Sequence, residues 1–273
     1  METLLRTSIR LVPWQWRGAI KRIPLVAPLQ RWLLARFMEG KPFVHTVDAG
    51  PARGLRYPIT LPADKGIWTG AYELELAQAM AQAVPRGSVC LDIGGWRGFF
   101  GGVMALAGAA RVVIFEPLPA NATQIRKMIE LNPGLPVELM EAAVSETDGE
   151  IEFCLMPETS MGKLAASSFQ AGAVAGERIK VRTVALDPLV AGGIIAAPAV
   201  IKIDVEGAEL LVLRGARQIL ATHGPKLFME IHSRTLGRDC RAFLTQLGYV
   251  VQTVEPGDPE VCHFIATRKV ASL

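Results

Sequence analysis

Seven polar residues follow short apolar runs of the sequence, at the points where predicted strands end. Carboxylates in such places accept hydrogen bonds from sugar hydroxyls or an ammonium group, and a histidine there can transfer a proton. In an open α/β sheet, the carboxyl ends of neighbouring strands meet at one edge, where ligands bind. We therefore expect one ligand site to gather these residues: Asp92, Glu116, Glu141, Asp204, Glu206, Glu230 and His232.

The stretch from 88 to 102, SVCLDIGGWRGFFGG, has the order strand, acidic residue, glycine loop, helix start. Its Asp92, Gly94 and Gly98 place a carboxylate before the turn, which suits a ligand carrying an ammonium group. A dinucleotide site would use Gly-x-Gly-x-x-Gly and aim helix-end amides at a pyrophosphate. S-adenosyl-L-methionine has an amino acid end and no phosphate. The spacing therefore favours it as the cofactor, and an NAD-dependent oxidoreductase is the less favoured alternative.

Further cofactor contacts are expected after the next two strands. Glu116 lies 24 positions after Asp92, where the second strand of a βαβ unit delivers an acid to the two hydroxyls of a ribose. The third strand is followed by Glu141, Ala142 and Ala143. Small residues there let an adenine ring lie flat, and either Glu141 or a backbone amide is placed to meet the ring edge.

The residues at the ends of the predicted strands 199–204 and 226–231 include groups that could take part in catalysis. His232 is the candidate base for methyl transfer, because an ordinary histidine pKa of roughly 6.5 lies near working pH. Glu230, two residues earlier, is placed to orient the imidazole or touch the substrate, whereas a loop-capping role is the alternative for His232. Asp204 and Glu206 suit the cofactor, the acceptor hydroxyl or a divalent ion such as Mg²⁺ or Ca²⁺, although their spacing does not require a metal.

The elements that must position these residues alternate along the chain. Glu73 starts a predicted helix that leads into the first strand, so it can face the ligand beside Tyr72, for which core packing is an equally good role. A hairpin is expected around 50–54, and two closing strands at 249–253 and 261–267 form a second hairpin. The fold class is therefore α/β, a mostly parallel Rossmann-like sheet with an antiparallel C-terminal strand. Further strands are expected at 110–115, 137–140, 151–155, 180–186, 199–204 and 226–231, and helices at 99–106, 119–131, 240–247 and from 207.

Charge separates the chain into two parts, 1–45 and 46–273. Residues 1–41 hold eight Lys and Arg and two Glu, together with Trp14, Trp16 and Trp32, and prolines divide them into short helices. This basic helical extension either packs on the core or contacts a partner or an anionic membrane surface. The remainder carries a small negative excess, which argues against general nucleic-acid binding. Residues 156–178 are expected to form a loop over the substrate.

Cysteine spacing and hydropathy indicate the cellular setting. The four cysteines form no Cys-x-x-Cys pair, so neither a zinc site nor a disulfide framework is expected, and Cys90 and Cys262 lie in predicted strands. No uninterrupted apolar run is long enough for a transmembrane helix. We therefore expect a cytoplasmic protein, and peripheral attachment to a membrane through residues 1–41 remains an alternative. A homo-oligomer also remains open.

Several of these motifs together resemble the FkbM family of S-adenosylmethionine-dependent methyltransferases. The resemblance implies a class I fold and O-methylation of a hydroxyl on a saccharide or small natural product; a non-catalytic adenosylmethionine-binding partner protein is the alternative. One departure is Trp96-Arg97 in the glycine loop, where the family usually has a small residue and Asn. The residues that carry the resemblance are WTGAYE (68–73), LDIGGWRGFF (91–100), FEPLPAN (115–121), AAVSETDGEIEF (142–153), IKIDVEGAELLVLRGA (201–216) and LFMEIH (227–232).

Overall fold

A seven-stranded sheet forms the centre of the protein in the computed structural model, which describes residues 42–155, 162–164, 178–254, 258 and 260–269. In spatial order its strands are β12 (Tyr249–Thr253), β13 (His263–Arg268), β11 (Lys226–Glu230), β10 (Val200–Ile203), β3 (Val89–Ile93), β4 (Arg111–Phe115) and β5 (Val137–Met140). Six of these strands run in the same direction, and only β13 runs opposite to them. The predicted mostly parallel sheet with an antiparallel C-terminal strand is confirmed.

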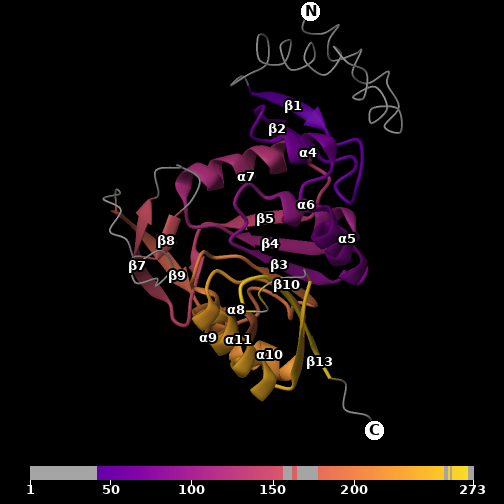
Figure 1. The fold of residues 1–273 in the computed structure, drawn as a ribbon. Helices are drawn as coiled ribbons and strands as arrows, with labels where there is room; N and C mark the ends of the chain where they lie inside the picture. Colours follow the sequence, from indigo (N-terminus) through magenta and orange to yellow (C-terminus); the bar gives the residue numbers. More distant parts are fainter. Residues whose placement is uncertain (1–41, 156–161, 165–177, 255–257, 259, 270–273) are drawn as a thin grey trace, which may run out of the picture.

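Helices cover both faces of this sheet (Figure 1). On one face lie α5 (Leu74–Ala83), α6 (Phe99–Leu106) and α7 (Pro119–Leu131), and on the other lie α8 (Leu186–Ala191), α9 (Glu209–Gly215), α10 (Arg217–Thr222) and α11 (Arg234–Gln246). Successive strand residues point to opposite faces. Cys90 and Val112 therefore pack under the first group of helices, while Leu91 and Val113 pack under the second. Two cores result, one on each side of the sheet.

A hairpin of β1 (Phe43–Thr46) and β2 (Arg56–Ile59) lies over α7, and α4 (Lys65–Thr69) follows it. Asn132 at the end of α7 fixes the hairpin, because its Oδ1 accepts the Arg56 amide at 2.9 Å and its Nδ2 donates to the Arg56 carbonyl at 2.7 Å. The predicted hairpin is confirmed. The division between 45 and 46 falls inside β1, so residues 43–46 belong with the body of the domain.

A second, four-stranded sheet begins just after the carboxyl end of β5 and lies beside the ends of the central strands (Figure 1). Its order is β6 (Ala143–Val144), β9 (Arg178–Val184), β7 (Gly149–Leu155), β8 (Gly162–Leu164). The strands predicted at 151–155 and 180–186 belong to this sheet. Most of the loop expected at 156–178, and the helical extension expected at 1–41, lie outside the described residues. Cys262 directly precedes β13 and is half-buried, so its placement within a strand is wrong. Among the described helices, none is both long and apolar enough to cross a bilayer.

Candidate functional site

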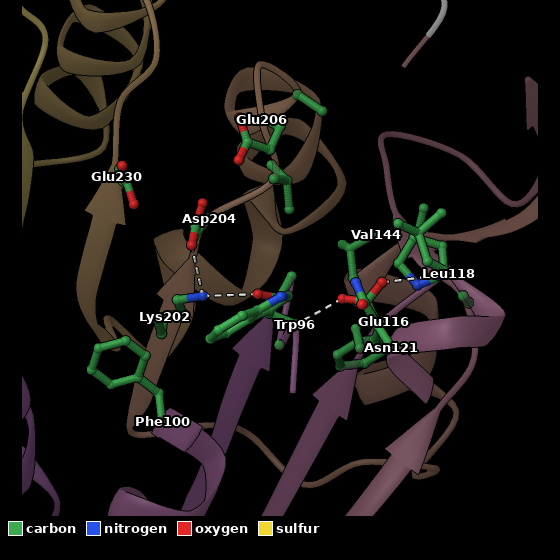
Figure 2. Close-up of a pocket in the computed structure, with 18 of the residues that line it drawn as sticks. Trp96, Phe100, Glu116, Leu118, Asn121, Val144, Lys202, Asp204, Glu206 and Glu230 are labelled. Atoms are coloured by element: carbon green, nitrogen blue, oxygen red, sulfur yellow. Dashed lines mark hydrogen bonds and ion pairs between the residues drawn. The ribbon is translucent and has the colours of Figure 1, made fainter. Parts of the chain in front are cut away.

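A cavity of about 430 Å³ lies over the carboxyl ends of β3, β4, β10 and β11, within the usual range for small-molecule sites. Figure 2 shows Glu116 on one side of it, and Asp204, Glu206 and Glu230 on the other. Of the residues expected at the site, the lining includes Glu73, Gly94, Glu116, Ala142, Ala143, Asp204, Glu206 and Glu230. The lining leaves out Asp92, Gly98, Glu141 and His232.

Glu116 is the buried acid at the end of β4, with only 4% of its surface exposed. Its Oε2 accepts the Trp96 amide and its Oε1 accepts the Leu118 amide, both at 2.9 Å. Burial raises the pKa of this carboxyl to about 7, although these amides and Asn121 lower it. Each carboxylate oxygen can accept more than one hydrogen bond, so Glu116 is held in place and can still receive hydroxyls from a ligand.

Asp92 is not among the residues that line the cavity, and the expectation that it lines the ligand site is wrong. It is fully buried inside β3, directly opposite Lys202 of β10, on the face covered by α6. Its Oδ2 accepts the Gly101 amide at 2.8 Å, and its Oδ1 lies 3.6 Å from Lys202 Nζ. Burial raises the pKa of Asp92 while Lys202 opposes that rise. The carboxylate therefore caps the first turn of α6.

Gly98 and Glu141, which were also expected to contact the cofactor, do not line the cavity. Gly98 lies at the N-terminus of α6 with φ +83°, and a Cβ there would come within 2.7 Å of Met128 Cε, so this glycine serves packing against α7. Glu141 follows β5 on the surface, where it pairs with Arg126. The pairing with Arg126 holds its carboxylate at the surface, which leaves Ala142 and Ala143 to line the cavity at this point.

The glycine loop is fixed from both sides. A Cβ on Gly94 would lie 1.7 Å from the Asp204 carbonyl oxygen, so the loop touches the end of β10 directly. Trp96 has φ +48°, lines the cavity and stacks on Tyr72 with ring centroids 6.1 Å apart. Arg97 points elsewhere: it pairs with Asp64 and donates to the Pro58 carbonyl at 2.8 Å. Of the two unusual loop residues, Trp96 shapes the cavity and Arg97 anchors the loop to β2.

Lys202 is a lining residue whose position the sequence left ambiguous. Its Nζ donates to the Gly94 carbonyl at 2.8 Å and to Asp204 Oδ2 at 3.2 Å, and lies 5.6 Å from the centre of the Phe100 ring. Burial lowers the pKa of this ammonium, but Asp204 and Asp92 outweigh that effect and raise it above its usual value. The lysine therefore stays charged and links β3, β10 and the glycine loop.

His232 lies behind the acidic side of the cavity, with 9% of its side chain exposed. Its Nδ1 is 2.7 Å from Glu209 Oε1, and its Nε2 is 3.4 Å from Glu206 Oε2 and 3.7 Å from Asp204 Oδ1. Burial lowers the pKa of His232, but Glu209, Glu206 and Asp204 together raise it to about 9. The expectation of an ordinary pKa near 6.5 is wrong, because that argument left out the surrounding acids. In this arrangement the imidazole already carries a proton at neutral pH.

Sequence reasoning did not single out Glu209 or Ser145 for the site. Glu209 is fully buried in the first turn of α9 and is the partner of His232. The only available signal was its place in the segment 201–216, six residues after the end of β10. Ser145 lines the cavity just after β6, and an isolated serine in a turn gives no comparable signal.

Similarity to known proteins agrees with this arrangement. A family model described as the methyltransferase FkbM domain matches residues 91–251. The hexuronic acid methyltransferase AglP of Haloferax volcanii is 29% identical over 137 residues, which are 50% of this chain and 54% of AglP. The chain thus spans about half the length of that curated relative.

Two crystal structures share 15% identity with this chain over 72% of its length. The methyltransferase FkbM from Methylobacillus flagellatus aligns over 59% of its own chain with a TM-score of 0.46, and the precorrin-6y C5,15-methyltransferase from Geobacter metallireducens over 89% with 0.45. The family match, by contrast, covers more than half of this chain, from the glycine loop through β12. It confirms the family resemblance and, with the sheet order, the class I fold. The chain belongs to the FkbM methyltransferase domain family.

Proposed function

We propose that this protein is an S-adenosylmethionine-dependent O-methyltransferase whose acceptor is a saccharide or a similar hydroxylated small molecule. The observation that carries the proposal is the distribution of acids in the cavity. Glu116 lies at one side, while Asp204, Glu206 and Glu230 gather at the other. The cofactor, when bound, would supply an electrophilic methyl group on a positively charged sulfonium, and an acidic cavity suits that charge.

The described residues fit this cofactor at three places. Glu116 at the end of β4 can accept the ribose hydroxyls, since its carboxylate is held by the Trp96 and Leu118 amides. Ala142 and Ala143 leave space beside it for a flat ring. At the other side, Glu73 can receive the ammonium group of the methionine end, a role first expected of Asp92.

The same geometry disfavours NAD. A pyrophosphate needs unoccupied backbone amides at the N-terminus of the helix that follows the glycine loop. Here the Gly101 amide at that position is bound by Asp92 Oδ2 at 2.8 Å. Phosphates would also lie among the carboxylates of the cavity, where like charges repel. The oxidoreductase alternative therefore has no support from the site.

The acceptor end is formed by Asp204, Glu206 and Glu230, which come from the ends of neighbouring strands. In methyl transfer these residues would hold an acceptor hydroxyl in line with the methyl group and take up its proton. His232 would act by orienting the carboxylates, which it contacts through Nε2. Similarity to AglP makes saccharides that contain a hexuronic acid the first acceptors to test.

The test combines binding with turnover. Calorimetry with S-adenosylmethionine, S-adenosylhomocysteine and NAD should show binding of the two adenosyl ligands only. Incubation with deuteromethyl-labelled S-adenosylmethionine and a panel of uronic acid and neutral saccharides should add a labelled methyl group, seen by mass spectrometry. Binding of NAD alone would refute the proposal. Adenosyl binding without transfer to any saccharide or hydroxylated natural product would favour the non-catalytic partner protein.

A further inference from the structure

Three potential metal ligands converge at the acceptor end of the cavity. Asp204 directly follows β10, Glu230 ends β11, and His232 lies two residues beyond Glu230. One ligand atom from each residue can be chosen such that all three lie within 4.8 Å of one another. Figure 2 shows the carboxylates of Asp204 and Glu230 on this side of the cavity, with Glu206 close by.

The orientation of His232 is that of a metal-binding histidine. Its Nδ1 lies 2.7 Å from Oε1 of the buried Glu209, which also accepts the Gly207 amide at 3.0 Å. This contact fixes the ring and turns Nε2 toward the other carboxylates. Metal-ligating histidines commonly use their second nitrogen in this way, since a carboxylate partner sets the tautomer and increases the basicity of the ligating nitrogen.

The distances around Nε2 suit a shared ion better than direct hydrogen bonds. Nε2 lies 3.4 Å from Glu206, 3.7 Å from Asp204 and 3.7 Å from Glu230. Charge-assisted N–H···O bonds usually close to 2.7–2.9 Å, as the Glu209 contact does. The three carboxylates therefore surround Nε2 at a spacing that leaves room for an ion between the groups.

Glu209 is a second buried group beside this cluster with an unsatisfied atom. It is fully buried, and its Oε2 has no hydrogen-bond partner among the described residues. A buried carboxylate requires a compensating positive charge close to it, and His232, with Nδ1 2.7 Å from Oε1, supplies that charge when it is protonated. Lys202 is committed to Asp92, Asp204 and the Gly94 carbonyl. A divalent ion on His232 Nε2 would take the place of the Nε2 proton and keep a positive charge next to the imidazole that Glu209 contacts.

We propose that Asp204, Glu230 and His232 bind a divalent cation, with Glu206 as an additional oxygen donor. Two carboxylates and one imidazole suit Mn²⁺ or a similar borderline ion better than Ca²⁺, which takes oxygen ligands alone. His232 lies behind the cavity wall, whereas Asp204 and Glu230 line it. The open side of the ion thus faces the cavity. There it can bind a hydroxyl or carboxylate oxygen of the acceptor, a role that rests on the proposed function.

A bound ion would also reverse the repulsion between the acids of the cavity and an acidic acceptor. The acceptor end presents Asp204, Glu206 and Glu230, and these acids would repel the carboxylate of a uronic acid. A bound divalent cation turns that repulsion into attraction and lowers the pKa of a hydroxyl that it ligates. The inferred substrate class is therefore a saccharide with neighbouring oxygen donors that chelate the metal.

Metal binding can be tested without any acceptor. Full-length protein treated with EDTA and dialysed is titrated with MnCl₂ and followed by electron paramagnetic resonance. We expect about one bound Mn²⁺ per chain, with a pulsed-resonance ¹⁴N coupling from the imidazole. Asp204→Asn and Glu230→Gln should each weaken binding at least tenfold, and His232→Gln should abolish the ¹⁴N coupling. The matched control is Glu138→Gln, which removes an exposed carboxylate paired with Arg111 and should leave Mn²⁺ binding unchanged.

Binding of S-adenosylhomocysteine to the same samples separates this proposal from the proposed function. The metal site is refuted if wild-type protein binds no Mn²⁺ at millimolar concentration, or if binding survives the Asp204→Asn, Glu230→Gln double substitution. Either result with S-adenosylhomocysteine binding intact leaves the methyltransferase proposal standing. Conversely, Mn²⁺ binding without any adenosyl ligand supports the metal site and counts against the proposed function. Circular dichroism confirms that each variant is folded.

Discussion

Lys202 Nζ donates a hydrogen bond of 2.8 Å to the carbonyl oxygen of Gly94, although the two residues are 108 positions apart. The same ammonium lies 3.6 Å from Asp92 and 3.2 Å from Asp204. One buried cation thus joins the glycine loop to β3 and β10. The cavity keeps its shape because these two strands and the loop cannot separate without leaving charges unpaired.

Replacing Lys202 by Met should destabilise the fold by about 3 kcal/mol, because Asp92 would remain fully buried without its cation. Urea denaturation followed by circular dichroism measures the loss. The control is Lys127→Met on the surface of α7, which breaks an exposed pair with Glu130 and should cost under about 1 kcal/mol. If both variants lose the same free energy of unfolding, the buried Lys202 network stabilises the fold no more than an exposed ion pair does.

Glu116 should make cofactor affinity depend on pH. Its pKa is raised to about 7 by burial, so the ligand-free protein holds a proton there below pH 7 and loses it above. Ribose hydroxyls donate to the ionised form. The affinity for S-adenosylhomocysteine should therefore fall up to about tenfold as the pH decreases from 8 to 6.

The Glu116→Gln variant is the matched control for that pH dependence. It keeps the shape of the side chain and removes the titration, so it should bind weakly and almost equally at both pH values. Calorimetry at pH 6, 7 and 8 gives the comparison. If wild type and variant show the same pH profile, another group is responsible and the ribose role of Glu116 is refuted.

Gly94 should tolerate no side chain. A Cβ there would lie 1.7 Å from the Asp204 carbonyl oxygen, and the φ of +74° is itself unfavourable for other residues. Gly54→Ala separates these effects, because Gly54 has φ +94° with no atom within 4 Å of the added Cβ. We expect a loss of about 1–2 kcal/mol for Gly54→Ala from backbone strain alone. Thermal melts should show a clearly larger loss for Gly94→Ala; similar melting temperatures would contradict the close contact.

Arg97 and Asp64 should be energetically coupled. The pair is largely buried, and Arg97 also donates to the Pro58 carbonyl at 2.8 Å. A double-mutant cycle with Arg97→Met and Asp64→Asn should give a coupling energy of about 2 kcal/mol in urea denaturation. The same cycle on the exposed pair Arg214 and Glu146 should give under about 1 kcal/mol. A coupling no larger than that of the exposed pair would mean that Arg97 does not anchor the loop.

Local sequence determined the secondary structure around the site closely. The helix predicted at 99–106 and the one at 119–131 match α6 and α7, and the strand at 137–140 matches β5. Apolar runs bounded by Gly and Pro carry this information, because burial and backbone freedom act over a few residues. The same runs identified Glu116, Asp204 and Glu230 as strand-end acids, and all three line the cavity.

Tertiary structure alone decided which of the remaining residues face the ligand. Asp92 lies inside β3 rather than after it, and its register opposite Lys202 directs it under α6. Glu141 turns outward to Arg126, and the surroundings of His232 include Glu209, 23 positions away. Sequence fixes residue types and short-range spacing. Side-chain direction and pKa depend on strand register and on charges brought together from distant positions, and these exist only once the chain has folded.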